Sequence, residues 1–289
     1  MEKKISERLA FYREHGYLII KNCFTSKEVE SMRASYRECI ANRPEGIEVI
    51  YEDDGSTPRS IMSYHQNIET LSYFTHEARV LDIVNEIVGP KYYVSQSKIN
   101  PKAPLDKSEI KGKKWDYHRG FSFWNLLDGI PEPSMVSSFI FLTEQTEENG
   151  AVFVLEGSHS DVSIEDIKNE IGADTSQVNN RKNDTSEYLS IQIRPEKISE
   201  YKKKYKRVVL EGNPGDLVFM HPNLLHASEP NMSDVSRDLM ISVYNSTDNL
   251  PQTPRNEHYL CERDFEPIAA VRLSHKLNEE PLEDTDTSI

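Results

Sequence analysis

An α+β fold, with helices packed on one face of a β-sandwich or jelly-roll barrel, is the class that the sequence predicts. Helical signals come first along the chain and short strand-like segments come later, an order typical of α+β domains. The later segments are rich in β-branched and aromatic residues and are separated by Gly, Pro and Asn, as in antiparallel sandwiches and barrels. No repeat or low-complexity linker divides residues 1–289, so a single domain is expected.

The N-terminal third is predicted to be mainly helical. Residues 4–15 form a charged amphipathic segment, and a short strand follows from Gly16. Thr25 and Glu28 have the spacing of a capping box, in which each side chain accepts a hydrogen bond from the other residue's backbone N–H at the start of a helix. A further helix, ARVLDIVNEIV, is expected to stop at Gly89-Pro90, because these residues punctuate helices.

Seven or so short strands are expected after residue 90. The predicted strand segments are KYYVSQSKINPKA, KWDYHRGFSFW, SMVSSFIFLTEQT, VFVLEGSH, the two sides of the NPG turn at 213–215, and RDLMISVYNST. Residues from about 160 to 200 are polar and predict an insertion or lid over one mouth of the barrel. The acidic residues from about 277 to 289 predict a loose tail.

Composition narrows the class of function. The formal net charge is −14, which argues against nucleic acid or an anionic membrane as partner, because both need a basic face. Three widely spaced cysteines without a CxxC pair indicate a reducing compartment and no disulfide framework. The N-terminus lacks the apolar core of a signal peptide, and no apolar run approaches the ~20 residues of a membrane span. A cytoplasmic enzyme or binding protein, monomeric or homodimeric, is expected.

Two of the nine histidines stand out. His118 and His226 lie on strand-like segments far apart in the sequence, and β-barrels assemble metal sites from such strands, although a lone strand histidine is more often a core residue. Arg237 follows on the next predicted strand, and arginine is suited to holding a carboxylate with two parallel hydrogen bonds. These three residues are the smallest set of side chains that could bind iron together with a 2-oxo acid. Non-haem Fe(II) oxygenases usually add a carboxylate ligand.

Five motifs, in the same order along the chain, resemble the phytanoyl-CoA dioxygenase superfamily of Fe(II)/2-oxoglutarate oxygenases, and within it the ectoine hydroxylase branch. The motifs are GYLIIKNCFTSKEVESMR, QSKINPK, YHRGFSFWNLLDGIPEP, NGAVFVLEGSH with Glu156 where proline is usual, and HASEPNMSDVSRDLMISVYNSTDN. The resemblance implies a double-stranded β-helix, or jelly-roll, barrel with flanking N-terminal helices. It implies that a small molecule is the substrate.

The resemblance also implies roles for individual residues. The implied metal ligands are His118 and His226. The residues implied to contact 2-oxoglutarate are Arg237, Asn100, Ser228 and Gln96. The residues expected to contact the substrate are Trp124, Phe121 and Phe123. Of these, Trp124 matches a substrate-lining tryptophan of the family motif, whereas plain barrel packing is the alternative for Phe121 and Phe123.

Gly120 departs from the family pattern, because the family's metal-binding aspartate falls at this position. In the Fe(II)/2-oxoglutarate halogenases a Gly or Ala takes the place of the carboxylate, and a halide occupies the vacancy. Losing one anionic ligand leaves a positive excess that chloride restores. The expectation is therefore a natural-product halogenase that uses Fe(II), 2-oxoglutarate, O2 and chloride at Gly120. It would chlorinate an unactivated C–H carbon of a small free metabolite, first of all an amino acid or a derivative.

Several alternatives stay open. Asp116 lies two residues before His118 and on a strand would face the same side, so it could replace the missing carboxylate. The protein could also be a hydroxylase that works with two histidines and a water, or an inactive relative that acts as a binding protein. A nucleotide or a carrier-tethered amino acid is an alternative substrate. Few positive groups other than Arg237 and Lys98 are expected in the pocket, which counts against a polyphosphate. Arg119 is expected at the surface or paired with the lid, and His221 is expected to be structural.

Overall fold

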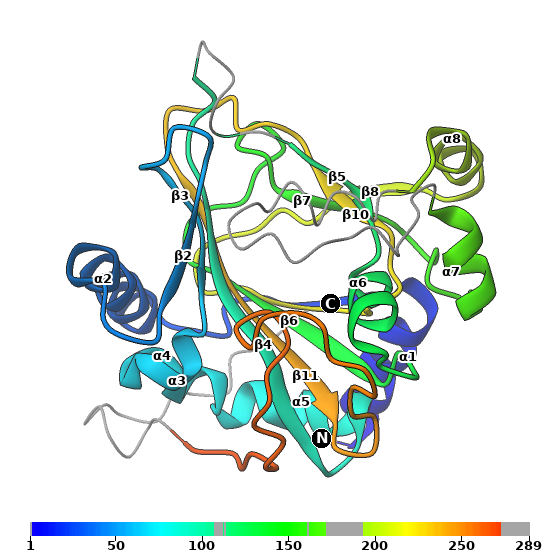
Figure 1. The fold of residues 1–289 in the computed structure, drawn as a ribbon, viewed down its shortest axis with the longest axis horizontal. Helices are drawn as coiled ribbons and strands as arrows, with labels where there is room; N and C mark the ends of the chain where they lie inside the picture. Colours follow the sequence, from blue (N-terminus) through cyan, green and yellow to red (C-terminus); the bar gives the residue numbers. More distant parts are fainter. Residues whose placement is uncertain (1, 107–111, 113, 161, 172–192, 273–289) are drawn as a thin grey trace.

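Two antiparallel sheets face each other in the computed structural model (Figure 1), which describes residues 2–272 except 107–111, 113, 161 and 172–192. The large sheet has the strand order β1-β9-β6-β11-β4-β3-β2, and the small sheet has the order β5-β10-β7-β8. The strands of the large sheet are β1 (Tyr17–Ile20), β2 (Glu48–Tyr51), β3 (Pro58–Met62), β4 (Tyr92–Lys102), β6 (Met135–Phe141), β9 (Leu217–Met220) and β11 (Arg237–Ser246). The strands of the small sheet are β5 (Trp115–His118), β7 (Val152–Leu155), β8 (Arg207–Val209) and β10 (His226–Ser228). The predicted jelly-roll class is confirmed.

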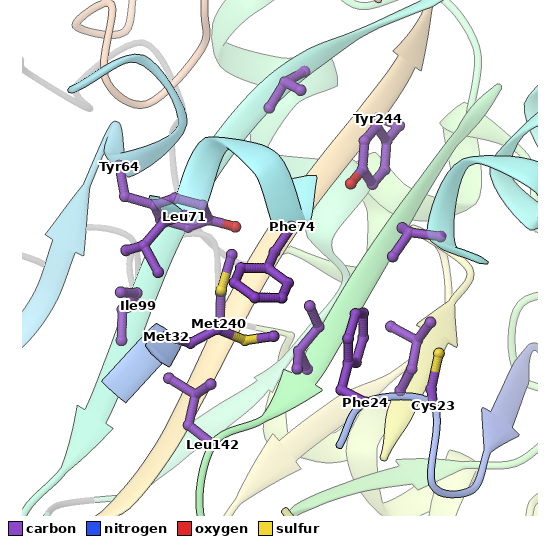
Figure 2. Close-up of a cluster of buried hydrophobic side chains, with 14 of the residues drawn as sticks. Cys23, Phe24, Met32, Tyr64, Leu71, Phe74, Ile99, Leu142, Met240 and Tyr244 are labelled. Carbon is purple, nitrogen blue, oxygen red and sulfur yellow. The ribbon is translucent and has the colours of Figure 1, made fainter. Parts of the chain in front are cut away.

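Helices cover the outer face of the large sheet, as the helix-first order of the sequence predicts (Figure 1). They are α2 (Ser26–Asn42), α3 (Tyr64–Asn67), α4 (Glu69–Thr75) and α5 (Ala78–Val88), preceded by α1 (Glu2–His15). Figure 2 shows Met32, Leu71 and Phe74 packed against Ile99 and Met240 of the sheet. The predicted capping box begins α2. None of the helices in the described ranges is long and apolar enough to cross a membrane.

Alternation along β4 and β11 decides which side chains face the space between the sheets. Lys98 and Asn100 line the inner cavity, whereas Ile99 packs against the helices. On β11, Leu239 and Ile241 pair with Asn100 and Lys98 respectively and also face inward. Neighbouring strand residues point to opposite faces, so alternate residues of these two strands line the cavity and the residues between them pack against the helices.

The single strand predicted over KWDYHRGFSFW is wrong. Strand β5 ends at His118, and helix α6 (Gly120–Asp128) begins two residues later. Phe121, Trp124 and Leu127 are buried on this helix, at the three-residue spacing of one helix face. Short apolar runs fit a strand and a buried helix equally well, and packing of this face selects the helix.

Other parts of the chain hold elements that the sequence did not indicate. The hairpin β2–β3 and the short helices α3 and α4 precede residue 90, and three strands rather than two lie between residues 205 and 228. The predicted insertion contains α7 (Ile164–Glu170) and the start of α8 (Pro195–Lys204). Its residues 172–192, and the predicted tail, lie outside the described residues.

Candidate functional site

A cavity between the two sheets brings together side chains from both of them and from α6. The predicted site residues that line this cavity are His118, Gly120, Phe123, Trp124, Gln96, Asn100, His226, Ser228 and Arg237. Phe121 is the exception: it is fully buried in a hydrophobic cluster with Leu127 and Ile167. Phe121 thus lies in the core around α6, and its contact with the substrate stays a prediction.

The two histidines come from neighbouring strands and face each other directly. His118 of β5 pairs in register with His226 of β10, and their ring centroids are 4.1 Å apart. Each Nδ1–H donates to a backbone carbonyl two residues earlier, His118 to Asp116 at 2.7 Å and His226 to Leu224 at 2.9 Å. This fixes each ring and leaves Nε2 with a free lone pair, as in metal-ligating histidines. Burial lowers the pKa of both imidazoles, which favours the neutral form that binds metal.

The position next to the histidines that would hold a third protein ligand is Gly120, at the start of α6. A side-chain Cβ placed here would lie 3.1 Å from Cζ3 of Trp124 and 3.7 Å from the carbonyl oxygen of Pro222. A small side chain thus needs only a slight shift of the tryptophan ring. Among the described residues, no group of three or more His, Cys, Asp or Glu side chains is arranged to hold a metal ion.

Asp116 does not complete the pair of histidines. Its carboxylate lies 2.7 Å from Nζ of Lys114, in a neighbouring pocket that Lys202 and Glu229 also line. Its backbone carbonyl accepts the Nδ1 hydrogen bond of His118. The described residues thus give no support to the alternative that Asp116 replaces the missing carboxylate. The donors offered by the chain are two neutral imidazoles, which suit Fe(II) with its other positions open to exogenous ligands.

Arg237 begins β11 and is buried in the cavity wall. No hydrogen-bond partner of its Nε lies within the described parts of the chain, and burial lowers the pKa of the guanidinium to about 10. A buried cation without a partner is costly. The arrangement is explained if a carboxylate ligand binds to this group. The donor set and this orphaned nitrogen fit an iron site beside a 2-oxo acid.

The comparison with known families gives one clear match. The family model described as phytanoyl-CoA dioxygenase (PhyH) matches residues 12–239, a range that includes His118, Gly120, His226 and Arg237. The chain belongs to the phytanoyl-CoA dioxygenase family. This is a family of Fe(II)/2-oxoglutarate-dependent enzymes, so the protein is an oxidoreductase of that class.

Relatives within the family match nearly the whole chain at low identity. The L-proline trans-4-hydroxylase of Streptomyces griseoviridis is 26% identical over 264 residues, covering 90% of this chain and 93% of the relative. The ectoine dioxygenase of Stutzerimonas stutzeri (strain A1501) is 28% identical over 272 residues, covering 91% and 86%. The solved structure of EctD from S. alaskensis with 2-oxoglutarate and 5-hydroxyectoine has a TM-score of 0.73 at 23% identity, covering 92% of this chain and 86% of that one. The last likeness supports the jelly-roll fold.

The C-terminal segment 255–260 forms one wall of the cavity, through Leu260, and no sequence pattern indicated it. The carbonyl of Leu260 accepts hydrogen bonds from Nε2 of Gln96 at 2.7 Å and from Nε1 of Trp124 at 3.4 Å. Asp128 holds this C-terminal segment by accepting from the backbone N–H groups of Arg255 and Asn256. Segment 255–260 has no periodic pattern that could have revealed this role. Gln96 is thus engaged by the protein itself.

Arg119 and His221 are both outside the set of predicted ligands, and the structure explains each. Arg119 is buried and forms an ion pair with Glu170 of α7, so it pairs with the predicted insertion and is not at the surface. His221 packs its ring against His159, with centroids 4.8 Å apart, and is not among the residues that line the cavity. Its structural role is consistent with that placement.

Phe121 and Phe123 offer a matched pair for testing the wall of the cavity. We expect Phe121→Ala to lower the free energy of unfolding by about 3–5 kcal/mol, because a fully buried ring leaves a void. We expect Phe123→Ala to cost less stability, because that ring is only partly buried and lines the cavity, and to change substrate KM instead. Chemical denaturation and steady-state kinetics measure both. The opposite pattern would show that the roles of the two rings are reversed.

Proposed function

We propose that the protein uses Fe(II) and 2-oxoglutarate to oxidise an unactivated C–H carbon of a small molecule that carries an anionic group. The observation that carries this proposal is one cavity in which His118, His226 and Arg237 meet from three different strands. Bound iron supplies the activation of oxygen, coupled to decarboxylation of 2-oxoglutarate. The protein's residues bind and orient the reactants and keep water out.

The proposed 2-oxoglutarate contacts follow from which hydrogen-bond groups remain free. Arg237 presents its planar fork, which matches the geometry of a carboxylate. Lys102 Nζ donates to Ser228 Oγ at 2.6 Å, so the hydroxyl proton of Ser228 is left to donate to the ligand. Ser60 Oγ donates to Asn100 Oδ1 at 2.8 Å, which leaves the amide N–H groups of Asn100 to donate. Three donors of complementary geometry thus face the proposed cosubstrate.

Lys98 supports an anionic substrate. Its side chain lines the cavity, and burial lowers the pKa of its ammonium to about 8. Among the described residues that line the cavity there is no Asp or Glu, so the protein offers this cation no partner there. A substrate carboxylate would supply one. The relatives named for proline and for ectoine support a small amino-acid-like molecule.

The comparisons support hydroxylation as the product better than halogenation. The relatives reported above are a proline hydroxylase and an ectoine dioxygenase, and their names give no support to a chloride requirement. Chlorination is the second candidate, and Gly120 is the specific observation that favours it. The vacancy beside His118 and His226 removes one anionic ligand, and Arg237 and Lys98 keep the cavity positive, so a small anion such as chloride would be stabilised there.

One product assay separates the candidates. The protein is supplied with Fe(II), 2-oxoglutarate and air, with and without chloride, and offered free amino acids, ectoine and related carboxylates. Hydroxylation adds one oxygen atom to the product mass. Chlorination exchanges hydrogen for chlorine, shows the chlorine isotope pattern and requires chloride. If no compound increases succinate formation above the level without substrate, and no product forms, the proposal of a small anionic substrate would be overturned.

The role of Lys98 is tested by two substitutions. We expect Lys98→Met to raise the KM of a carboxylate substrate by about 10- to 150-fold, the loss of one hydrogen bond to a charged group worth 1.5–3 kcal/mol, with unchanged affinity for 2-oxoglutarate. We expect Lys98→Arg to retain most of the affinity. Because the ammonium loses its proton as the pH rises through about 8, substrate binding by the wild type should weaken above that pH. In Lys98→Met the substrate KM should not show this rise with pH. Equal substrate KM values for Lys98→Met and Lys98→Arg would contradict the proposal that Lys98 binds the substrate carboxylate.

A further inference from the structure

Arg119 stands between His118 and Gly120 and is one of the largest fully buried side chains. Its guanidinium forms a two-pronged ion pair with Glu170, Nε to Oε2 at 2.9 Å and Nη2 to Oε1 at 3.0 Å. The proposed chemistry above uses neither residue. A buried ion pair adds little to folding stability, because the desolvation of both charges offsets their attraction. The pair therefore calls for a role other than stability.

The remaining hydrogen bonds of Arg119 connect the two strands that carry the histidines. Nη1 donates to the carbonyl of Ser158 at 2.7 Å and to the carbonyl of Asn223. Asn223 belongs to the loop that leads into β10, and the next residue, Leu224, supplies the carbonyl that orients His226. Arg119 directly follows His118, and its guanidinium binds the loop that orients the ring of His226. It spans both halves of the proposed metal site.

Glu170 is placed by α7 and α8, which belong to neither sheet. It is the last residue of α7, and its backbone carbonyl accepts from the N–H of Arg194 at 2.9 Å. Its carboxylate also accepts from the hydroxyl of Tyr201 on α8, and the guanidinium of Arg119 lies 5.6 Å from the ring centre of that tyrosine. Helices α7 and α8 are therefore connected to Arg119 through the carboxylate of Glu170.

We propose that Arg119 and Glu170 are positioning residues for the two-histidine metal site, and that α7 and α8 set metal affinity through this ion pair. The inference rests on the proposed function, because it takes His118 and His226 as metal ligands. Arg119 holds the β9–β10 loop at a fixed distance from the end of β5. Glu170 keeps the guanidinium in the orientation that reaches both carbonyls. Without Glu170 the guanidinium is free to rotate, and the two imidazoles lose their common geometry.

The test measures binding of Co(II), as a spectroscopic substitute for Fe(II), to the full-length protein. The ligand-field absorption bands of Co(II) report affinity and coordination geometry without any turnover. We expect Glu170→Gln to weaken Co(II) binding by about 10- to 100-fold, the usual effect of losing a residue that orients a metal ligand, and to shift the absorption bands. Arg119→Lys keeps the charge but lacks the planar fork, so we expect an intermediate loss.

Two further variants separate positioning from folding. The double variant Arg119→Met/Glu170→Met replaces the buried pair by apolar side chains, so its thermal stability is expected to equal or exceed that of Glu170→Gln while Co(II) affinity stays low. Glu147→Gln breaks the exposed 2.7 Å ion pair with Arg207 on β8 and is expected to change neither quantity.

The outcomes are distinguishable. If the wild type binds Co(II) and Glu170→Gln binds it equally well with unchanged bands, the positioning inference is overturned while the metal site stands. If the double methionine variant recovers both stability and affinity, the pair serves folding alone, and the inference is again overturned. If the wild type binds no Co(II), the proposed function fails and this inference fails with it. Should Glu170→Gln not fold, Arg119→Lys and the double variant decide the matter by the same criteria.

Discussion

Arg237→Met is expected to weaken 2-oxoglutarate binding by about 30- to 5000-fold, because removing one partner of a buried charge pair costs 2–5 kcal/mol. The proposed ligand carboxylate would lose two parallel hydrogen bonds and lie buried without a counter-charge. Isothermal titration of 2-oxoglutarate into the metal-loaded protein measures the change. The affinity for metal in the absence of 2-oxoglutarate should stay as in the wild type, since the guanidinium is not one of the proposed ligands.

The same substitution is expected to act in the opposite direction on the ligand-free protein. Arg237 is buried, no partner of its Nε lies among the described residues, and the charge of Asp238 offsets only part of the cost of burying the guanidinium. Replacing it by an apolar side chain of similar length should leave the melting temperature unchanged or raise it. Arg207→Met, at an exposed position on β8, is the control and should alter neither binding nor stability. A variant that binds 2-oxoglutarate as tightly as the wild type would show that the carboxylate is held elsewhere.

Gly120→Asp is expected to supply the third ligand that the two histidines lack. The carboxylate begins beside His118 at the start of α6, and carboxylates are common iron ligands. We expect Co(II) affinity to rise by roughly tenfold and any effect of chloride on the absorption bands or on the product to disappear. If the wild type chlorinates its substrate, this variant should hydroxylate it or lose activity. If the wild type hydroxylates, the variant should do so without a chloride effect.

Gly120→Ala is the matched control for this substitution. Alanine introduces the same Cβ, 3.1 Å from Trp124, but no ligand atom. It therefore reports the cost of moving the tryptophan ring separately from the gain of a ligand. Glycine is not required by the backbone here, because Gly120 is not among the residues with a positive φ. If the alanine and aspartate variants bind Co(II) alike, Gly120 serves only to make room for Trp124, and the vacancy has no part in the chemistry.

The ligand-type residues were predictable from the sequence because their chemistry is carried by single side chains. His118, His226 and Arg237 lie on three segments with strand-like composition, and a barrel places such strands around a common interior. The family resemblance of QSKINPK implied that Gln96 and Asn100 face the same interior. The structure places all five in the lining of one cavity.

The path of α6, and with it the core position of Phe121, was not predictable. FSFW alternates as a strand does, yet Phe121 and Trp124 occupy successive turns of one helix. Only the packing partners of the segment distinguish these two cases, and those partners, such as Ile167 of α7, are far away in the sequence. The same reason hid the bond from Gln96 to Leu260, which joins residues 164 positions apart.

Strand periodicity and composition let the sequence predict the fold class, because these are local properties. The resemblance carried by five motifs let it predict the family and a two-histidine site with glycine at the third position. The tertiary structure alone decided that the Asp116 carboxylate pairs with Lys114, that Lys98 has no acidic partner among the described residues of the cavity, and that Arg119 joins the site to α7. Each of these depends on which distant backbone segments come into contact. Such contacts are set by the packing of the whole chain, and no local pattern encodes them.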